Sequence, residues 1–110
     1  MSVPEIDIAE LDRRRVAGGC VLDVRELDEY ATAHIDGVVH IPLSELVERR
    51  DELTVDDEKL VICARGSRSL QAAEYLAALG HSTVNVSGGM YAWIGAGLPV
   101  SIGVDMTETP

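Results

Sequence analysis

Cysteine is scarce in this sequence, and the clusters in which it usually builds structure are missing. The 110 residues include two cysteines, Cys20 and Cys63. Two cysteines do not make a disulfide framework, and thiols in the cytosol are normally kept reduced. Neither belongs to a CxxC pair or to a group of cysteines and histidines at zinc-ligand spacing. The sequence therefore predicts no metal site and no cofactor, and each cysteine must be explained by itself.

Long hydrophobic runs and a basic amino-terminal segment are also missing. No apolar stretch approaches the roughly 20 residues that span a bilayer. The first residues, MSVPEIDIAELDRRR, carry acids where a signal peptide has a basic start followed by an apolar core. These absences predict a cytoplasmic protein that does not bind membranes.

Positive charge is in short supply. Nine lysines and arginines stand against 19 acids, for a net charge of −10, which disfavours general electrostatic binding to nucleic acid. The imbalance is uneven, because residues 61–100 hold two arginines and one glutamate, a net charge of +1. The remaining segments therefore carry −11, and residues 61–100 are the part suited to bind an anion. Nothing in the sequence indicates an oligomeric state.

The composition is that of an ordinary folded domain, with 46% hydrophobic and 25% charged residues. The length suits one hydrophobic core. We expect a domain over residues 1–100, followed by a flexible tail over residues 101–110.

Short apolar runs alternate with helical patterns along the chain. Asp7 and Glu10 predict a capped start for the first helix, and Ser44 predicts a cap for the third. The alternation indicates an α/β protein with a mainly parallel sheet, in which ligands bind beyond the carboxyl ends of the strands. Strands are predicted at 20–24, 38–41, 59–63 and 82–86, and helices at 8–16, 26–37, 45–53, 67–79 and 87–97.

The stretch VICARGSRSL, residues 61–70, joins a predicted strand to a predicted helix. Cys63 stands where the strand ends, and the first N–H groups of the helix carry partial positive charge. Gly66 lets the backbone curl into an anion-binding nest, while Arg65 and Arg68 add full charges. Ser67 or Ser69 is expected to cap the helix. These features favour a reactive thiolate at Cys63. The alternative is an inert buried cysteine followed by a basic turn.

Three stretches of the chain resemble rhodanese-like domains, in the order that the family has them. VLDVRELDEYATAHIDGVVHIPLSEL (21–46) is similar to the first conserved block, VICARGSRSLQAAEYLAALG (61–80) to the active-site loop and helix, and VSGGMYAWIGAGLPV (86–100) to the closing block. The resemblance covers nearly the whole chain. It implies a three-layer α/β sandwich, with a central, mainly parallel five-stranded sheet and helices on both faces.

The same resemblance implies a thiosulfate sulfurtransferase without cofactor. Cys63 would take a sulfane sulfur from a small anionic donor such as thiosulfate, become a persulfide, and pass the sulfur to cyanide or to a thiol, including a thiol-bearing protein acceptor. Transfer in two steps through one cysteine is covalent catalysis, with ping-pong kinetics. The donor-binding loop implied by the family's motif consists of Ala64, Arg65, Gly66, Ser67, Arg68 and Ser69. Ala33 and Asp36 depart from the common pattern, in a turn remote in sequence from Cys63.

Two other functions stay open. A rhodanese-like domain can serve as a non-catalytic interaction or sulfur-sensing module, although such a module has no need of Cys63 and its cationic loop. A cysteine-dependent phosphatase or arsenate reductase is a more distant alternative. Phosphatases of that kind place five residues between cysteine and arginine, whereas four separate Cys63 from Arg68.

Several conspicuous residues are expected to be structural. Asp23 and Arg25 are interpreted as an internal ion pair, and His34 as a packed turn residue. Cys20 is interpreted as a small buried hydrophobe, and Trp93 as part of the core. His40 and His81 have no partner at ligand spacing.

Overall fold

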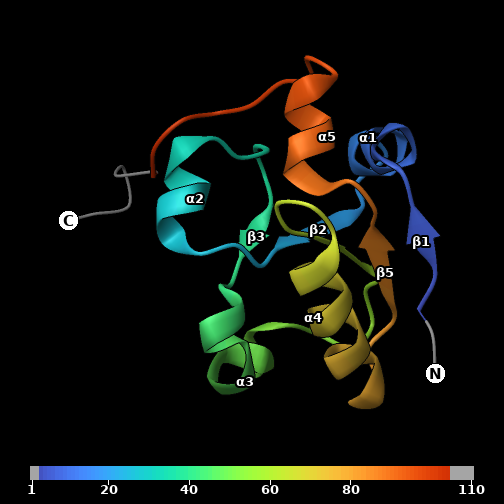
Figure 1. The fold of residues 1–110 in the computed structure, drawn as a ribbon. Coiled ribbons are helices and arrows are strands. Elements are labelled where there is room, and N and C mark those ends of the chain that lie inside the picture. Colours follow the sequence, from blue (N-terminus) through green and yellow to red (C-terminus); the bar gives the residue numbers. More distant parts are fainter. Residues whose placement is uncertain (1–2, 105–110) are drawn as a thin grey trace.

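The computed structural model describes residues 3–104, and its centre is a five-stranded sheet (Figure 1). The strand order is β1-β5-β4-β2-β3, and every neighbouring pair is parallel. The predicted α/β class and five-stranded parallel sheet are thereby confirmed. The sequence pattern had not indicated β1, because two residues are too short to show a period. The strands are β1 (Glu5–Ile6), β2 (Cys20–Asp23), β3 (Val39–His40), β4 (Lys59–Ile62) and β5 (Thr83–Val86).

Helices cover both faces of the sheet (Figure 1). α1 and α5 lie on one face and α3 and α4 on the other, which gives the three layers that the sequence predicted. The helices are α1 (Ile8–Val16), α2 (Leu27–Thr32), α3 (Leu46–Arg49), α4 (Ser67–Ala78) and α5 (Gly89–Gly95), with 3₁₀ turns η1 (Leu43–Glu45) and η2 (Arg50–Glu52) flanking α3.

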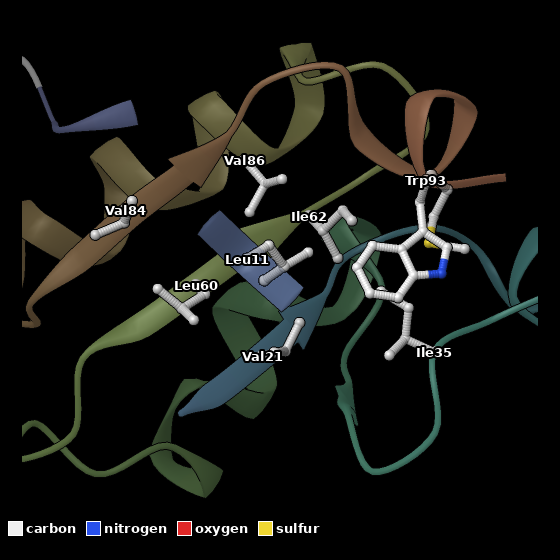
Figure 2. Packing of buried hydrophobic residues seen from close by; sticks show 9 residues of the cluster. Leu11, Val21, Ile35, Leu60, Ile62, Val84, Val86 and Trp93 are labelled. Carbon is white, nitrogen blue, oxygen red and sulfur yellow. The ribbon is translucent and has the colours of Figure 1, made fainter. Parts of the chain in front are cut away.

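Side chains of the central strands alternate between two buried clusters, because successive residues of a strand point to opposite faces. Val21, Leu60 and Ile62 face α1 and α5, where they meet Leu11 and Trp93 (Figure 2). Leu22 and Val61, one residue along, belong to the second cluster, together with Ala72, Ala73 and Leu76 of α4 and Cys63 itself. Cys63 therefore lies directly after a fully buried strand.

The first predicted helix is confirmed together with its cap. The side chain of Asp7 accepts a hydrogen bond of 2.9 Å from the backbone N–H of Glu10. α2 is shorter than predicted: it ends at Thr32 instead of reaching residue 37, and Ala33 has an extended φ of −167°. Leu27, at the first position of α2, is 54% exposed.

α2 ends early because other groups bind its last carbonyl oxygens and the backbone that follows it. The Arg25 guanidinium donates to the carbonyl oxygens of Glu29 (3.3 Å) and Ala33 (2.7 Å). His34 then pairs with Ser101 through backbone hydrogen bonds of 2.9 and 2.7 Å. Both partners come from outside the helix, so no helical pattern could show them.

The third predicted helix, at 45–53, is broken into η1, α3 and η2. Ser44 does not cap it, since its hydroxyl donates to the carboxylate of Glu26 (2.9 Å). The expected Glu45–Arg49 ion pair is present at 2.9 Å. α5 is also shorter than predicted, and Ile94 within it is 50% exposed.

The described part of the expected tail is attached to the domain. Besides the pairing of Ser101 with His34, the backbone N–H of Gly103 donates to the carbonyl oxygen of Ala31 (2.6 Å). Residues 105–110, the rest of the predicted tail, lie outside the described residues. Between residues 3 and 104, no helix combines the length and the apolar character needed to cross a bilayer.

Candidate active site

Cys63 directly follows β4 at the carboxyl edge of the sheet, with a side chain only 1% exposed. The chain then turns through Ala64, Arg65 and Gly66 into α4. Gly66 has a φ of +110°, in the left-handed region that favours glycine, and it occupies the N-cap position. The tight turn directs the Gly66 N–H back to the Cys63 sulfur, at 3.1 Å. Neither Ser67 nor Ser69 caps α4, in contrast to the prediction.

The surroundings of the Cys63 sulfur stabilise its anion. Burial raises the pKa of the thiol, but the hydrogen bond between Sγ and the Ser69 hydroxyl and the backbone N–H groups of Ser69, Gly66 and Arg65 together outweigh the effect of burial. The pKa of Cys63 is therefore below its ordinary value, as expected for a sulfur that faces a helix amino terminus. The side chain of Cys20 behaves oppositely: burial, with a smaller effect of the Asp57 charge, raises its pKa.

Ser69 connects the sulfur to a buried polar network that the sequence analysis missed. Its Oγ lies 3.2 Å from the Cys63 Sγ and 2.6 Å from Oδ1 of Asn85. The Asn85 Nδ2 donates to the Gly66 carbonyl (3.2 Å) and to Glu5 Oε2 (2.8 Å). A signal was available, because an asparagine inside the apolar strand 82–86 requires buried hydrogen-bond partners.

A second missed contribution comes from the glycine pair before α5. The backbone N–H of Met90 donates to the Cys63 carbonyl (2.8 Å), and that of Tyr91 to the Ala64 carbonyl (2.9 Å). A Cβ on Gly89 would lie 2.4 Å from the Cys63 carbonyl oxygen, and its φ is +56°. Only glycine lets the first turn of α5 approach the loop this closely.

Both loop arginines are engaged by other side chains. Arg68 binds the Glu29 carboxylate through two nitrogens, at 2.7 and 2.8 Å. Arg65 lies over the ring of Tyr91, with its guanidinium carbon 4.5 Å from the ring centre. Arg68 still interacts electrostatically with the Cys63 anion, although Glu29 is the main cause of its raised pKa. The hydrogen-bond partners of the sulfur are backbone N–H groups and the Ser69 hydroxyl, so the anion-binding role of the arginines stays a prediction.

The Asp23–Arg25 pair is internal, as the sequence predicted. The two side chains are buried, with an ion-pair distance of 2.8 Å. Because Arg25 also binds the carbonyl groups at the end of α2, the pair fixes the helix that carries Glu29. Its role is to hold α2 against the sheet.

The other residues interpreted as structural are also placed. His34 is a packed turn residue as predicted, with Nδ1 2.9 Å from the Tyr30 carbonyl and its ring stacked on Tyr30. Trp93 is fully buried. Cys20 is only partly buried, in contrast to the prediction of a buried hydrophobe, because it stands at the first position of its strand. It is paired with Lys59 at the amino ends of β2 and β4, so it lies at the opposite edge of the sheet from Cys63.

Comparison with known proteins gives a consistent set of relatives. The family model described as "Rhodanese-like domain" matches residues 7–96. The putative sulfurtransferase YtwF of Bacillus subtilis is 39% identical over 101 residues, which cover 90% of this chain and 98% of that protein. The putative sulfur carrier protein YrkF of the same organism is 43% identical over 97 residues, covering 86% of this chain. The match spans about half of YrkF, 52%.

Thiosulfate sulfurtransferase GlpE of Pseudomonas entomophila is 34% identical over 80 residues, which cover 72% of this chain and 73% of that protein. Among solved structures, a rhodanese-related protein from Thermoplasma volcanium has a TM-score of 0.84 and 40% identity, covering 90% of this chain and 98% of the other. A rhodanese-like domain protein from Staphylococcus aureus has the same TM-score, 0.84, at 30% identity, covering 93% of this chain and 100% of the other.

Proposed function

The chain belongs to the rhodanese-like domain family, and from this we propose that it is a sulfurtransferase in which Cys63 carries a sulfane sulfur as a persulfide. The donor is a small sulfur-bearing anion such as thiosulfate, and the acceptor is cyanide or a thiol of a small molecule or protein. The cytoplasm, which keeps thiols reduced, is the proposed compartment.

One observation carries the proposal: a buried sulfur faces hydrogen-bond donors at the start of a helix. The Gly66 N–H lies 3.1 Å from Sγ, and the hydrogen bonds around it lower the pKa of the thiol despite burial. Such surroundings stabilise negative charge both on a thiolate and on a sulfur atom bound to it. An inert core cysteine needs no such donors.

The proposed reaction has two displacement steps. The Cys63 thiolate attacks the outer sulfur of thiosulfate, a new S–S bond forms, and sulfite leaves with the electron pair of the bond that breaks. The acceptor then attacks the outer sulfur of the persulfide. Cys63 leaves as the thiolate, so no oxidant or reductant is consumed beyond donor and acceptor.

The position of Arg68 disfavours a phosphatase or arsenate reductase. Those reactions need a guanidinium that is free to bind oxygens of the substrate through two nitrogens. In this chain Arg68 already binds Glu29 through two nitrogens, at 2.7 and 2.8 Å. A single sulfur atom held by backbone donors does not depend on it.

The proposal predicts a persulfide that is detectable by its mass. After incubation with thiosulfate, intact-protein mass spectrometry should show one added sulfur atom that dithiothreitol removes. The adduct should be missing from Cys63→Ser and retained in Cys20→Ser, the matched control at the opposite edge of the sheet. Wild-type protein that acquires no sulfur would instead favour the interaction or sensing module.

A further inference from the structure

The hydrogen bonds of Asn85 fix the direction of its side-chain amide. Nδ2 has two hydrogens, and both are used, one toward the Gly66 carbonyl and one toward the Glu5 carboxylate. Both partners are pure acceptors, so the amide cannot be reversed. Oδ1 must therefore face Ser69. Parallel pairing places Glu5 directly beside Asn85 in the sheet, which makes the contact part of the fold.

The direction of the amide in turn fixes the Ser69 hydroxyl. Oδ1 of Asn85 can only accept, so the single hydroxyl hydrogen of Ser69 is directed to it across 2.6 Å. The Ser69 oxygen is then left as an acceptor for the Cys63 thiol, 3.2 Å away. This arrangement suits a protonated sulfur. A thiolate has no hydrogen to give, and it needs the hydroxyl to turn and donate to it.

We propose that Asn85 is a positioning residue that acts through Ser69, holding the hydroxyl hydrogen while Cys63 is a thiol and releasing it when Sγ becomes an anion. The inference rests on the proposed role of Cys63 as the nucleophile. Turning the hydroxyl leaves the buried Asn85 oxygen without a donor, which is costly. Asn85 thereby makes the thiolate less stable and a better nucleophile than Ser69 and the loop alone would make it.

In this switch, the Ser69 hydroxyl changes its acceptor between Asn85 and Sγ as the charge on Sγ changes through the two displacement steps. When Sγ attacks a sulfur donor, it gains a covalent bond and the negative charge moves to the outer sulfur. The Ser69 hydroxyl is then free to return to Asn85. When the acceptor removes the outer sulfur, Sγ leaves as an anion and the hydroxyl turns to it again, which stabilises the leaving group.

Two substitutions of Asn85 separate this role from simple support of the loop. Asn85→Leu and Asn85→Asp both lose the two N–H donors to Gly66 and Glu5, but only the aspartate keeps an acceptor for Ser69. The readout is the pH midpoint of Cys63 alkylation by iodoacetamide, located by peptide mass spectrometry. We expect the midpoint to fall by about one pH unit in Asn85→Leu, roughly tenfold more thiolate below both midpoints. In Asn85→Asp it should rise.

The leucine variant is the decisive one, because the aspartate also adds a charge. The neighbouring charged groups are the same in both variants: Arg68 is held by Glu29 of α2, Arg65 lies over Tyr91 of α5, and Glu5 of β1 loses the same Asn85 donor in each. A role confined to supporting the loop would misplace the N–H donors and raise the midpoint in both variants. That result would overturn the proposal.

The effect must also pass through Ser69. In a Ser69→Ala background, Asn85→Leu should no longer lower the midpoint; a fall that persists there would contradict the proposal. A measurement on the wild type needs no variant to fold. The ¹⁵N resonance of the Asn85 side chain should move with the Cys63 midpoint, since Oδ1 loses a hydrogen bond as the sulfur ionises. A resonance that stays constant through that midpoint would count against the switch.

The same samples separate this inference from the proposed function. Thiosulfate loading, measured by intact-protein mass, tests sulfur transfer. Alkylation and the Asn85 resonance test the orientation of the Ser69 hydroxyl. Loading of the wild type without the predicted midpoint shifts would end the Asn85 proposal alone. Shifted midpoints without loading would end the sulfurtransferase proposal alone.

Discussion

At the scale of single residues, the two cysteines have opposite surroundings within one small protein. Hydrogen-bond donors lower the pKa of Cys63, while burial and a nearby carboxylate raise that of Cys20. One cysteine follows β4 at the carboxyl edge of the sheet, and the other opens β2 at the amino edge. Each therefore serves as the reference for the other in the same sample.

The first residue-scale prediction is a difference in titration. The pH midpoint for alkylation of Cys63 should lie below the roughly 8.5 of a free cysteine, and that of Cys20 should lie above it. The sign follows from the charge of the reactive form, since donors stabilise the thiolate and burial destabilises it. Peptide-resolved mass spectrometry after iodoacetamide at a series of pH values measures both. Coinciding midpoints would contradict the site described here.

A second residue-scale prediction concerns the approach of α5 to the loop. Gly89→Ala places a Cβ 2.4 Å from the Cys63 carbonyl oxygen on a backbone with a φ of +56°. Left-handed strain and overpacking together should lower the free energy of unfolding by about 3 kcal/mol, measured by urea denaturation.

Gly95→Ala is the matched control in the same helix, because nothing lies within 4 Å of the Cβ it would add and its φ is not positive. Alanine is the better helix former, so this variant should be neutral or slightly more stable. Equal losses in the two variants would show that close packing at Gly89 is not the cause.

At the scale of elements, the Glu29–Arg68 ion pair joins α2 to α4, the helix that follows the Cys63 loop. Both side chains are 33% exposed, so solvent screens the pair and its contribution is at most about 1 kcal/mol. The hydrogen bond from Arg68 lowers the pKa of Glu29, although burial opposes it. The link is modest in energy, but it fixes the position of a loop cation.

The element-scale prediction is a pH-dependent loss of stability in Glu29→Gln. Because the folded-state pKa of Glu29 is lowered, its stabilising effect is present above the unfolded value of about 4.3 and is lost as pH falls through the folded value. Urea unfolding should show the variant less stable than wild type at pH 7, with the difference shrinking toward zero as pH falls through the lowered pKa of Glu29. Asp28→Asn, exposed on the same helix, is the control for charge removal. A deficit that does not change with pH would contradict the ion-pair explanation.

Element boundaries also show where sequence reasoning reached its limit. Local signals predicted α1 and α4 well. The cap of α1 by Asp7 and the helix-forming, Ala-rich run 67–79 depend on residues that are close together in the sequence. α2 was predicted too long, since the groups that end it lie outside the helical pattern: the Arg25 side chain folds back from just before the helix, and Ser101 comes from the far end of the domain. Tertiary contacts of this kind leave no periodic trace.

At the scale of the whole molecule, the sheet edge and the cysteine could be predicted, but the partners of the site could not. Cys63 and its loop are contiguous in sequence, so local features together with the resemblance to rhodanese-like domains could predict them as a candidate site. Asn85, Glu5 and Gly89 reach the same place from β5, β1 and α5, through strand order and helix packing. The arginines were identified as loop residues, whereas their engagement by Glu29 and Tyr91 required the folded chain.

The contact between α5 and the loop has a consequence for the polarity of the loop. In a trans peptide, C=O and N–H point in opposite directions. Tyr91 holds the Ala64 carbonyl toward α5, and the same peptide plane therefore turns the Arg65 N–H toward the sulfur. If that plane rotated by half a turn, a carbonyl dipole would face Cys63 and repel a negative charge on its sulfur. By fixing the orientation of this peptide, α5 keeps an N–H group, with its partial positive charge, directed at the Cys63 sulfur.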